Sequence, residues 1–488
     1  MSSILTNKSA MVALQTLKMI NSNLSQTQSE ISTGKKIASA KDNSSIWAIS
    51  KVMESDVKGF KGIAESLSLG ESTVAVARQG SETITGLLTD IKSKIVAAQE
   101  ENVDRAKIQT DISALRDQIN SVVNAAQFNG LNLLKGTEDV NILSSLDRAP
   151  DGSVSASNIT IARQDMSTTA GVLGTGTDLS ANATLSAATA TNAGNTATVT
   201  IATDGDMSDN TLSISIGGAS LNYSVGDLSG DQDAAASTIS GAINALGIVG
   251  VTASVSANVI TLTSTRAFED VSLAATGATA SASSIAERAE SLTFSGSANV
   301  AEGDGYQVTV GSNTFTYVAG KGETFEDVAK GLKAAVDGGT IAGLSTQVAQ
   351  NSSNQWVLKI DNDAGTSQSL ARAGAAGGTA SGGLFGLDSI DVTTNAGANS
   401  ALSNIENLIN NSIDAAANFG SAQGRIEIQS EFIGKLTDSL RAGIGSMVDA
   451  DMEEASARLQ ALQVQQQLGI QSLSIANQSP QSILSLFR

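Results

Sequence analysis

The amino-terminal part of the chain carries apolar residues at helical spacing. Up to Gly34, a suitable helix stop, they step by threes and sevens like one stripe of an α-helix, at Leu14, Leu17, Leu24 and Ile31. A second stretch, from about Ser45 to Ala98, has an apolar face along its length and would span about 80 Å as one helix. A third stretch alternates steps of four and three, the seam of a coiled coil or bundle, at Ile108, Ile112, Leu115 and Ile119. Asn129 and Gly130 then predict a turn.

Glycines interrupt the second stretch, at Gly59, Gly62, Gly70, Gly80 and Gly86. Each glycine inside a helix costs about 1 kcal/mol relative to alanine. Either the helix is broken there, or close neighbours require small residues.

The carboxyl-terminal part repeats the helical pattern. From Leu402 to Gln478 there is no proline, and apolar residues again recur at helical spacing. The final segment has apolar residues at or near the carboxyl end, at Leu459, Leu462, Leu473, Leu484 and Phe487. Residues 463–467 are mostly glutamine, so this segment gains little from folding alone.

The middle, from about Asp139 to Asn399, is rich in Ala, Ser, Thr and Gly and contains short alternating runs. Thr198 to Ile201 and Val357 to Ile360 are typical of half-buried strands. A degenerate repeat of roughly 90 residues is also visible, each copy reading as hairpin, helix and second strand pair. The corresponding segments are 212–226 with 306–320, 234–246 with 325–336, and 252–263 with 346–360. The alternative is that Ser/Thr-rich strands resemble one another by composition.

The two helical ends lack separate cores, so they most simply bury their stripes against each other. We therefore predict an α+β fold, in which both termini form a long antiparallel α-helical bundle or coiled coil and a β-rich outer region is inserted. The predicted inner coiled coil comprises residues 1–38 and 451–488, and the predicted helical core comprises 39–140 and 399–450. The predicted β-rich domains comprise residues 141–285 and 286–398.

The chain contains no cysteine and no histidine. Disulfides, thiol nucleophiles and many metal sites need cysteine, and serine–histidine triads and histidine acid–base catalysis need histidine. We therefore expect no enzyme and no cofactor. The net charge of −19 disfavours nucleic-acid binding, and no apolar run approaches the ~20 residues of a membrane-spanning helix. No apolar stretch follows Lys8, so a cleaved secretory signal peptide is not expected.

An acidic group near the carboxyl end admits two interpretations; it comprises Asp449, Asp451, Glu453 and Glu454. A calcium or magnesium site would need further oxygen ligands and the glycine of an EF-hand, which this spacing lacks. A helix amino-terminus is favoured, because carboxylates stabilise that end of the helix dipole.

Short motifs at both ends form an ordered set. Residues 32–42 read Ser-Thr-Gly-Lys-Lys-Ile-Ala-Ser-Ala-Lys-Asp, and residues 127–130 read Gln-Phe-Asn-Gly, with Phe128 before the turn. Near the other end stand Val-Asp-Ala-Asp-Met at 448–452 and Ile-Ala-Asn-Gln-Ser-Pro-Gln at 475–481. In their order and distance from the termini, these motifs resemble the amino- and carboxyl-terminal signatures of bacterial flagellin. The resemblance does not include the middle, which differs freely within that family.

The resemblance implies a secreted structural subunit that polymerises with itself into the extracellular flagellar filament used for swimming. It further implies export, unfolded and uncleaved, through the flagellar type III apparatus. The implied partners are further copies of the chain, the flagellar cap, the hook-junction proteins, and an export chaperone at the carboxyl end. Both extreme ends would order only on assembly. Members sensed by a toll-like host receptor carry an arginine-rich patch where this chain has Asp90, which argues against such sensing.

Two other functions remain open. The hook–filament junction protein shares both helical ends, although the glutamine-rich segment and the Asn-Gln-Ser-Pro-Gln motif favour flagellin. A surface adhesin that acts through the β-rich middle belongs to a different class, and glycan binding by residues 190–370 alone would support it.

Overall fold

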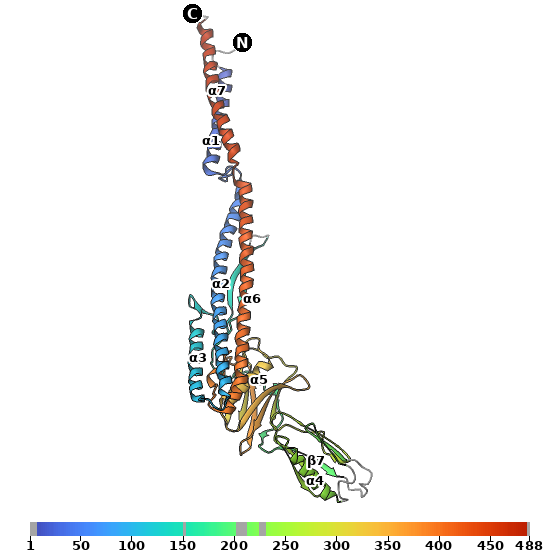
Figure 1. The fold of residues 1–488 in the computed structure, drawn as a ribbon. Helices are drawn as coiled ribbons and strands as arrows, with labels where there is room; N and C mark the ends of the chain where they lie inside the picture. Colours follow the sequence, from blue (N-terminus) through green and yellow to red (C-terminus); the bar gives the residue numbers. More distant parts are fainter. Residues whose placement is uncertain (1–6, 150–152, 202–211, 224–230, 486–488) are drawn as a thin grey trace. The chain divides into compact units, whose positions relative to one another are not determined.

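The computed structural model describes residues 7–149, 153–201, 212–223 and 231–485, without the side chains of 479–485 (Figure 1). Two compact units are distinguished, each assembled from separate stretches of the chain. Unit 1 comprises residues 1–72, 141–161 and 423–488, and unit 2 comprises residues 73–140 and 162–422.

Long helices occupy both ends of the chain, as predicted. They are α1 (Lys8–Thr33), α2 (Ser44–Ala98), α3 (Arg105–Ala125), α6 (Asn395–Val448) and α7 (Met452–Ser485). Helix α2 is continuous over 55 residues despite its glycines. Together with the β-rich middle, these helices confirm the α+β class. None of the helices in the described part of the chain is long and apolar enough to cross a membrane.

Three of the five glycines in α2 lie under neighbouring side chains. In unit 1, the hairpin of β3 (Val140–Arg148) and β4 (Val154–Ile161) lays Ile142 on Gly70 and Leu146 on Gly59. A Cβ added at Gly70 would lie 2.3 Å from Cδ1 of Ile142. In unit 2, a Cβ at Gly80 would lie 2.9 Å from Cδ1 of Leu134. The second explanation for the glycines, close neighbours, therefore holds at these three positions.

The middle of unit 2 contains two groups of antiparallel strands, each around its own apolar core. We call residues 195–285 β-cluster 1. Its sheets have the strand orders β10-β11-β7-β13 and β14-β12-β8-β9. The strands are β7 (Asn195–Ile201), β8 (Leu212–Ile216), β9 (Ala219–Tyr223), β10 (Val251–Ser256), β11 (Val259–Ser264), β12 (Val271–Thr276), β13 (Ala278–Ala280) and β14 (Ser284–Ile285). Helix α4 (Gln232–Ala245) buries Ile239 and Ile243 in this core (Figure 1).

We call residues 183–190 and 290–375 β-cluster 2. Its sheets have the strand orders β18-β19-β15-β5 and β17-β16-β20-β6. The strands are β5 (Ala183–Leu185), β6 (Thr189–Ala190), β15 (Glu290–Phe294), β16 (Gly305–Val310), β17 (Asn313–Val318), β18 (Leu344–Gln350), β19 (Trp356–Asn362) and β20 (Gln368–Ala375). Helix α5 (Phe325–Gly338) begins at a capping box of Thr324 and Asp327 and buries Val328 and Leu332. Single-turn helices at Ser180–Asn182 and Leu387–Ser389 flank the cluster in sequence.

The two clusters have the same strand order, because β17-β16-β20-β6 read from its other end corresponds to β14-β12-β8-β9. They differ in which part of the sequence supplies two of the strands. In β-cluster 1, β13 and β14 follow the other strands in sequence. In β-cluster 2 the corresponding positions are occupied by β5 and β6, which precede β-cluster 1 in sequence. Hence β-cluster 1 is inserted within β-cluster 2. Both predicted helices, 234–246 and 325–336, correspond to α4 and α5.

Replacing Gly70 with alanine is expected to destabilise unit 1 by about 1–3 kcal/mol, because the new methyl group overpacks against the buried Ile142 side chain. Replacing Gly62 with alanine, in the same helix and with no atom in the way, is expected to stabilise it by about 1 kcal/mol. Urea unfolding followed by circular dichroism measures both changes. Equal effects of the two substitutions would contradict the packing explanation.

Candidate assembly elements

Helices α1 and α7 form an antiparallel pair within unit 1 (Figure 1). The Asn7 side chain donates to the Ala476 carbonyl at 2.7 Å, and the Gln466 side chain donates to that of Asn21 at 2.7 Å. Asn7 also caps α1 by accepting from the Ala10 amide. The first helix and the last helix of the chain are therefore direct neighbours.

Most of the predicted assembly residues lie along the facing stripes of this pair. Those that are buried or partly buried are Leu17, Leu24, Ile31, Leu459, Leu462 and Leu473. Leu14 is 44 % exposed. The side chain of Leu484 and the whole of Phe487 lie outside the described residues. Burial within one chain does not test a role in assembly, which stays a prediction.

A second apolar face of α7 is exposed. Val464, Leu468 and Ile475 are 55 %, 56 % and 69 % exposed. They lie about 200–240° around the helix from Leu462, whereas Leu473 lies within about 20° of it. On α1, Met11, Val12 and Met19 are likewise 59–63 % exposed. The pair thus covers one stripe of each helix and leaves other apolar side chains in water.

A short two-stranded contact joins the connections at the inner ends of these helices. Gly34 ends α1 with φ of 68°. The Lys36 amide donates to the Val448 carbonyl at 2.8 Å, and the Ala450 amide donates to the Gly34 carbonyl at 3.0 Å. Ile37 and Val448 are buried beside these bonds. We call residues 34–37 and 448–450 the ribbon.

The Ser-Ala-Lys-Asp motif builds the turn that follows the ribbon. Asp42 accepts hydrogen bonds from the amides of Ala38 and Ser39 and from the Ser39 hydroxyl, at 2.9–3.1 Å. These bonds, those from Ser39 foremost, hold the pKa of the Asp42 carboxyl below its usual value. Asn43 then accepts from the amides of Ser45 and Ile46 at the start of α2. The sequence showed this motif only as a signature, and the structure shows that it closes the turn directly before the residue that caps α2.

The acidic group near the carboxyl end has the geometry of a helix start. Asp451 accepts from the amides of Glu453 and Glu454 at 3.0 and 3.2 Å, and both glutamates lie in the first turn of α7. Within the described ranges, no group of three or more acidic residues could hold a metal ion.

The predicted core-helix residues lie in α3 and the turn after it. Ile112 and Ile119 are fully buried, while Ile108 and Leu115 are partly buried. Phe128 pairs with Leu131 in the hairpin of β1 (Gln127–Phe128) and β2 (Leu131–Asn132). Asn129 and Gly130 form its two-residue turn with φ of 49° and 81°. This predicted turn is confirmed, while the contribution of these residues to a filament core stays a prediction.

Periodicity did not reveal a buried hydroxyl layer between α2 and α6 in unit 2. Ser81 and Ser412 have no exposed surface. The Ser412 hydroxyl donates to the Ser81 carbonyl at 3.0 Å and lies 2.9 Å from the Thr85 hydroxyl. Nearby, Lys92 forms an ion pair with Glu406. Polar residues in a helical pattern are read as exposed, so only the observed packing identifies this layer.

These features define a class of structural protein. Its first and last helices pair, a β-rich region is inserted between them in sequence, and apolar side chains on both helices are exposed.

The comparisons with known proteins identify the family. Residues 4–139 match the bacterial flagellin N-terminal helical region, and residues 402–487 match the bacterial flagellin C-terminal helical region. The chain is 32 % identical to Flagellin A of Rhizobium meliloti, with 100 % of both chains covered. It is 26 % identical to a flagellin of Bartonella bacilliformis, covering 97 % of this chain and 96 % of that one. The chain belongs to the bacterial flagellin family.

The solved structures that resemble it are more distant. Flagellar hook associated protein-3 from Legionella pneumophila is 10 % identical, with a TM-score of 0.33 over 81 % of this chain and 98 % of that chain. A TM-score this low carries no argument about function.

Replacing Gly34 with alanine is expected to cost about 1–2 kcal/mol, because an alanine side chain is strained at the positive φ of this position. Exchange of the Lys36 and Ala450 amide hydrogens should therefore accelerate about 5- to 30-fold, since 1.4 kcal/mol corresponds to a factor of ten. Hydrogen exchange measured by mass spectrometry on the polymerised full-length protein tests this.

Gly34→Asn is the matched control, because asparagine tolerates the left-handed conformation better than other residues with a side chain. Protection close to the wild-type value is expected for it. If the alanine variant also keeps wild-type protection, Gly34 does not set the geometry of the ribbon.

Proposed function

We propose that this flagellin is a structural subunit that polymerises into the flagellar filament through its helical ends. The observation that carries the proposal is the exposed apolar face of α7, opposite the stripe that covers α1. Three large aliphatic side chains on one face of a helix are costly to leave in water, at about 1.5–3 kcal/mol each. Further copies of the same chain would cover this face in a filament.

The energetics of the paired ends support assembly-dependent ordering. Among the described side chains of α1 and α7, those buried are Ile20, Thr27, Ala455 and Leu462. So little burial offsets only part of the conformational entropy lost on ordering, about 1–2 kcal/mol per residue. Contacts with neighbouring subunits would supply the remainder, and folding of the ends would then be coupled to polymerisation.

The proposed domain organisation keeps the helical ends separate from the β-rich middle. Residues 1–38 and 451–488 would form the inner coiled coil. The remaining helices would form the filament core, together with the β3–β4 hairpin that packs on Gly59 and Gly70. The two β-clusters would form the outer region. Their shared strand order supports a duplicated hairpin–helix–hairpin unit rather than similarity by composition alone.

Family membership supports proposals about export and partners. We propose secretion of the unfolded chain through the flagellar type III apparatus. A chain without cysteine is suited to this route, because it forms no disulfides on the way. The flagellar cap, the hook-junction proteins and an export chaperone at the carboxyl end are the proposed partners besides further copies. Full-length similarity to flagellins favours the filament subunit over the junction protein or an adhesin.

Polymerisation is expected to fail when the exposed face of α7 is made polar. The change is V464S/L468S/I475S, which leaves the stripe facing α1 intact. Losing three buried aliphatic side chains per interface should raise the critical concentration at least about 1,000-fold, since each contributes about 1.5–3 kcal/mol and every 1.4 kcal/mol is tenfold. Seeded assembly of the full-length protein, followed by sedimentation and electron microscopy, measures this.

The control is Q463S/Q465S/Q467S, which introduces the same residue into the same exposed helix without removing large apolar side chains. It should assemble like the wild type, and its monomer helicity should match that of the first variant. Normal filaments from V464S/L468S/I475S would show that this face is not an assembly contact.

A further inference from the structure

Two short peptides connect the β-clusters. The chain leaves β-cluster 2 after Ala190 and enters β7 at Asn195, and it returns from Ile285 to β15 at Glu290. Connections of this length usually act as hinges when nothing holds them. The returning peptide, residues 286–289, is held by side chains on both sides, and we call it the brace.

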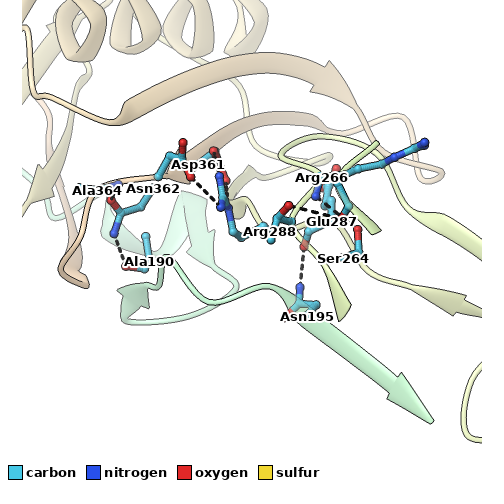
Figure 2. Close-up of polar contacts among 12 residues, drawn as sticks. Ala190, Asn195, Ser264, Arg266, Glu287, Arg288, Asp361, Asn362 and Ala364 are labelled. Carbon is cyan, nitrogen blue, oxygen red and sulfur yellow. Dashed lines mark hydrogen bonds and ion pairs between the residues drawn. The ribbon is translucent and has the colours of Figure 1, made fainter. Parts of the chain in front are cut away.

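Arg288 of the brace forms a buried ion pair with β19 (Figure 2). Its Nε and Nη2 atoms each lie 2.8 Å from one carboxylate oxygen of Asp361, and its Nη1 atom lies 3.0 Å from Asp363. The side chains of Arg288 and Asp361 are 7 % and 3 % exposed. The pair of parallel hydrogen bonds fixes the guanidinium plane as well as its position. Hydrogen bonding to Asp361 also raises the pKa of Arg288.

The neighbouring residue of the brace contacts both clusters. The side chain of Glu287 forms an ion pair with Lys359 of β19 at 2.5 Å. Its amide donates to Asp270 at 2.9 Å, and its carbonyl accepts from the side chain of Asn195 at 2.7 Å (Figure 2). Asp270 and Asn195 belong to β-cluster 1, whereas Lys359 belongs to β-cluster 2. Glu287 therefore forms polar contacts with both β-clusters.

Backbone hydrogen bonds complete the attachment. The Arg288 amide donates to the Arg266 carbonyl at 2.8 Å, and the Ala289 amide donates to the Ala267 carbonyl at 3.0 Å. On the outgoing connection, the buried side chain of Asn362 donates to the Ala190 carbonyl at 2.9 Å. The brace therefore runs beside residues 266–267 and does not cross freely between the clusters.

Buried ion pairs of this kind add little net stability, because desolvation of both charges offsets their attraction. Their directional hydrogen bonds do restrict geometry. We propose that Arg288 is a positioning residue that makes residues 286–289 a rigid brace, so that β-cluster 1 keeps a single orientation to β-cluster 2 in the free protein. The proposal concerns the monomer and does not depend on polymerisation.

The test measures one distance between the clusters. The chain has no cysteine, so S254C and S352C introduce the only two spin-label sites, both at exposed positions in different clusters. Double electron–electron resonance on the full-length monomer should give one narrow distance distribution. R288A should widen it at least twofold, and R288K, which keeps the charge but not the parallel hydrogen bonds, should give an intermediate width.

The matched control is R441A, which removes an arginine whose ion pair with Asp438 is exposed. It should leave the distribution unchanged. R288A leaves Asp361 buried without its partner, so R288Q/D361N, which buries no charge, is the second variant. Native circular dichroism with a widened distribution is expected for it. A broad distribution in the wild type, or equal widths in the wild type and the folded Arg288 variants, would overturn the proposal.

Discussion

The terminal segments of this flagellin are constrained by apolar stripes that no segment can cover by itself. A helix with one stripe gains stability only when another element removes that stripe from water. In unit 1, α7 covers α1, and the β3–β4 hairpin covers part of α2. In unit 2, the hydroxyl layer holds α2 beside α6. The same requirement, left unmet on the outer face of α7, underlies the proposed polymerisation.

Small residues allow this covering to occur at short range. Gly59, Gly70 and Gly80 cost helix propensity, but each removes a Cβ from the path of a neighbouring aliphatic side chain. Ser81 and Ser412 are small residues buried between two helices, and their hydroxyls are satisfied by hydrogen bonds. At these glycines, α2 loses helix propensity but gains close tertiary contacts, and the helix remains continuous.

The β-rich middle obeys a different constraint, since its clusters have cores of their own. Aromatic residues are only 3 % of the chain, yet Phe294, Tyr306 and Phe325 lie together in β-cluster 2, with ring centroids 5.4–5.9 Å apart. With independent cores, the connection between the clusters is not set by hydrophobic packing. Directional polar contacts, such as those of Arg288, are then the means available to fix it.

The sequence by itself determined the helices at both ends, several strands and both helices of the middle, and the family. Leu17, Leu24 and Ile31 repeat at helical spacing, and Asn129-Gly130 strongly favours a turn, so these features depend on residues close together in the chain. Only the tertiary structure decided why α2 contains glycine, where β5 and β6 pair, and that Arg288 meets Asp361. Each of these depends on contacts between residues far apart in sequence. The local spacing of apolar residues does not indicate which distant residues will be in contact.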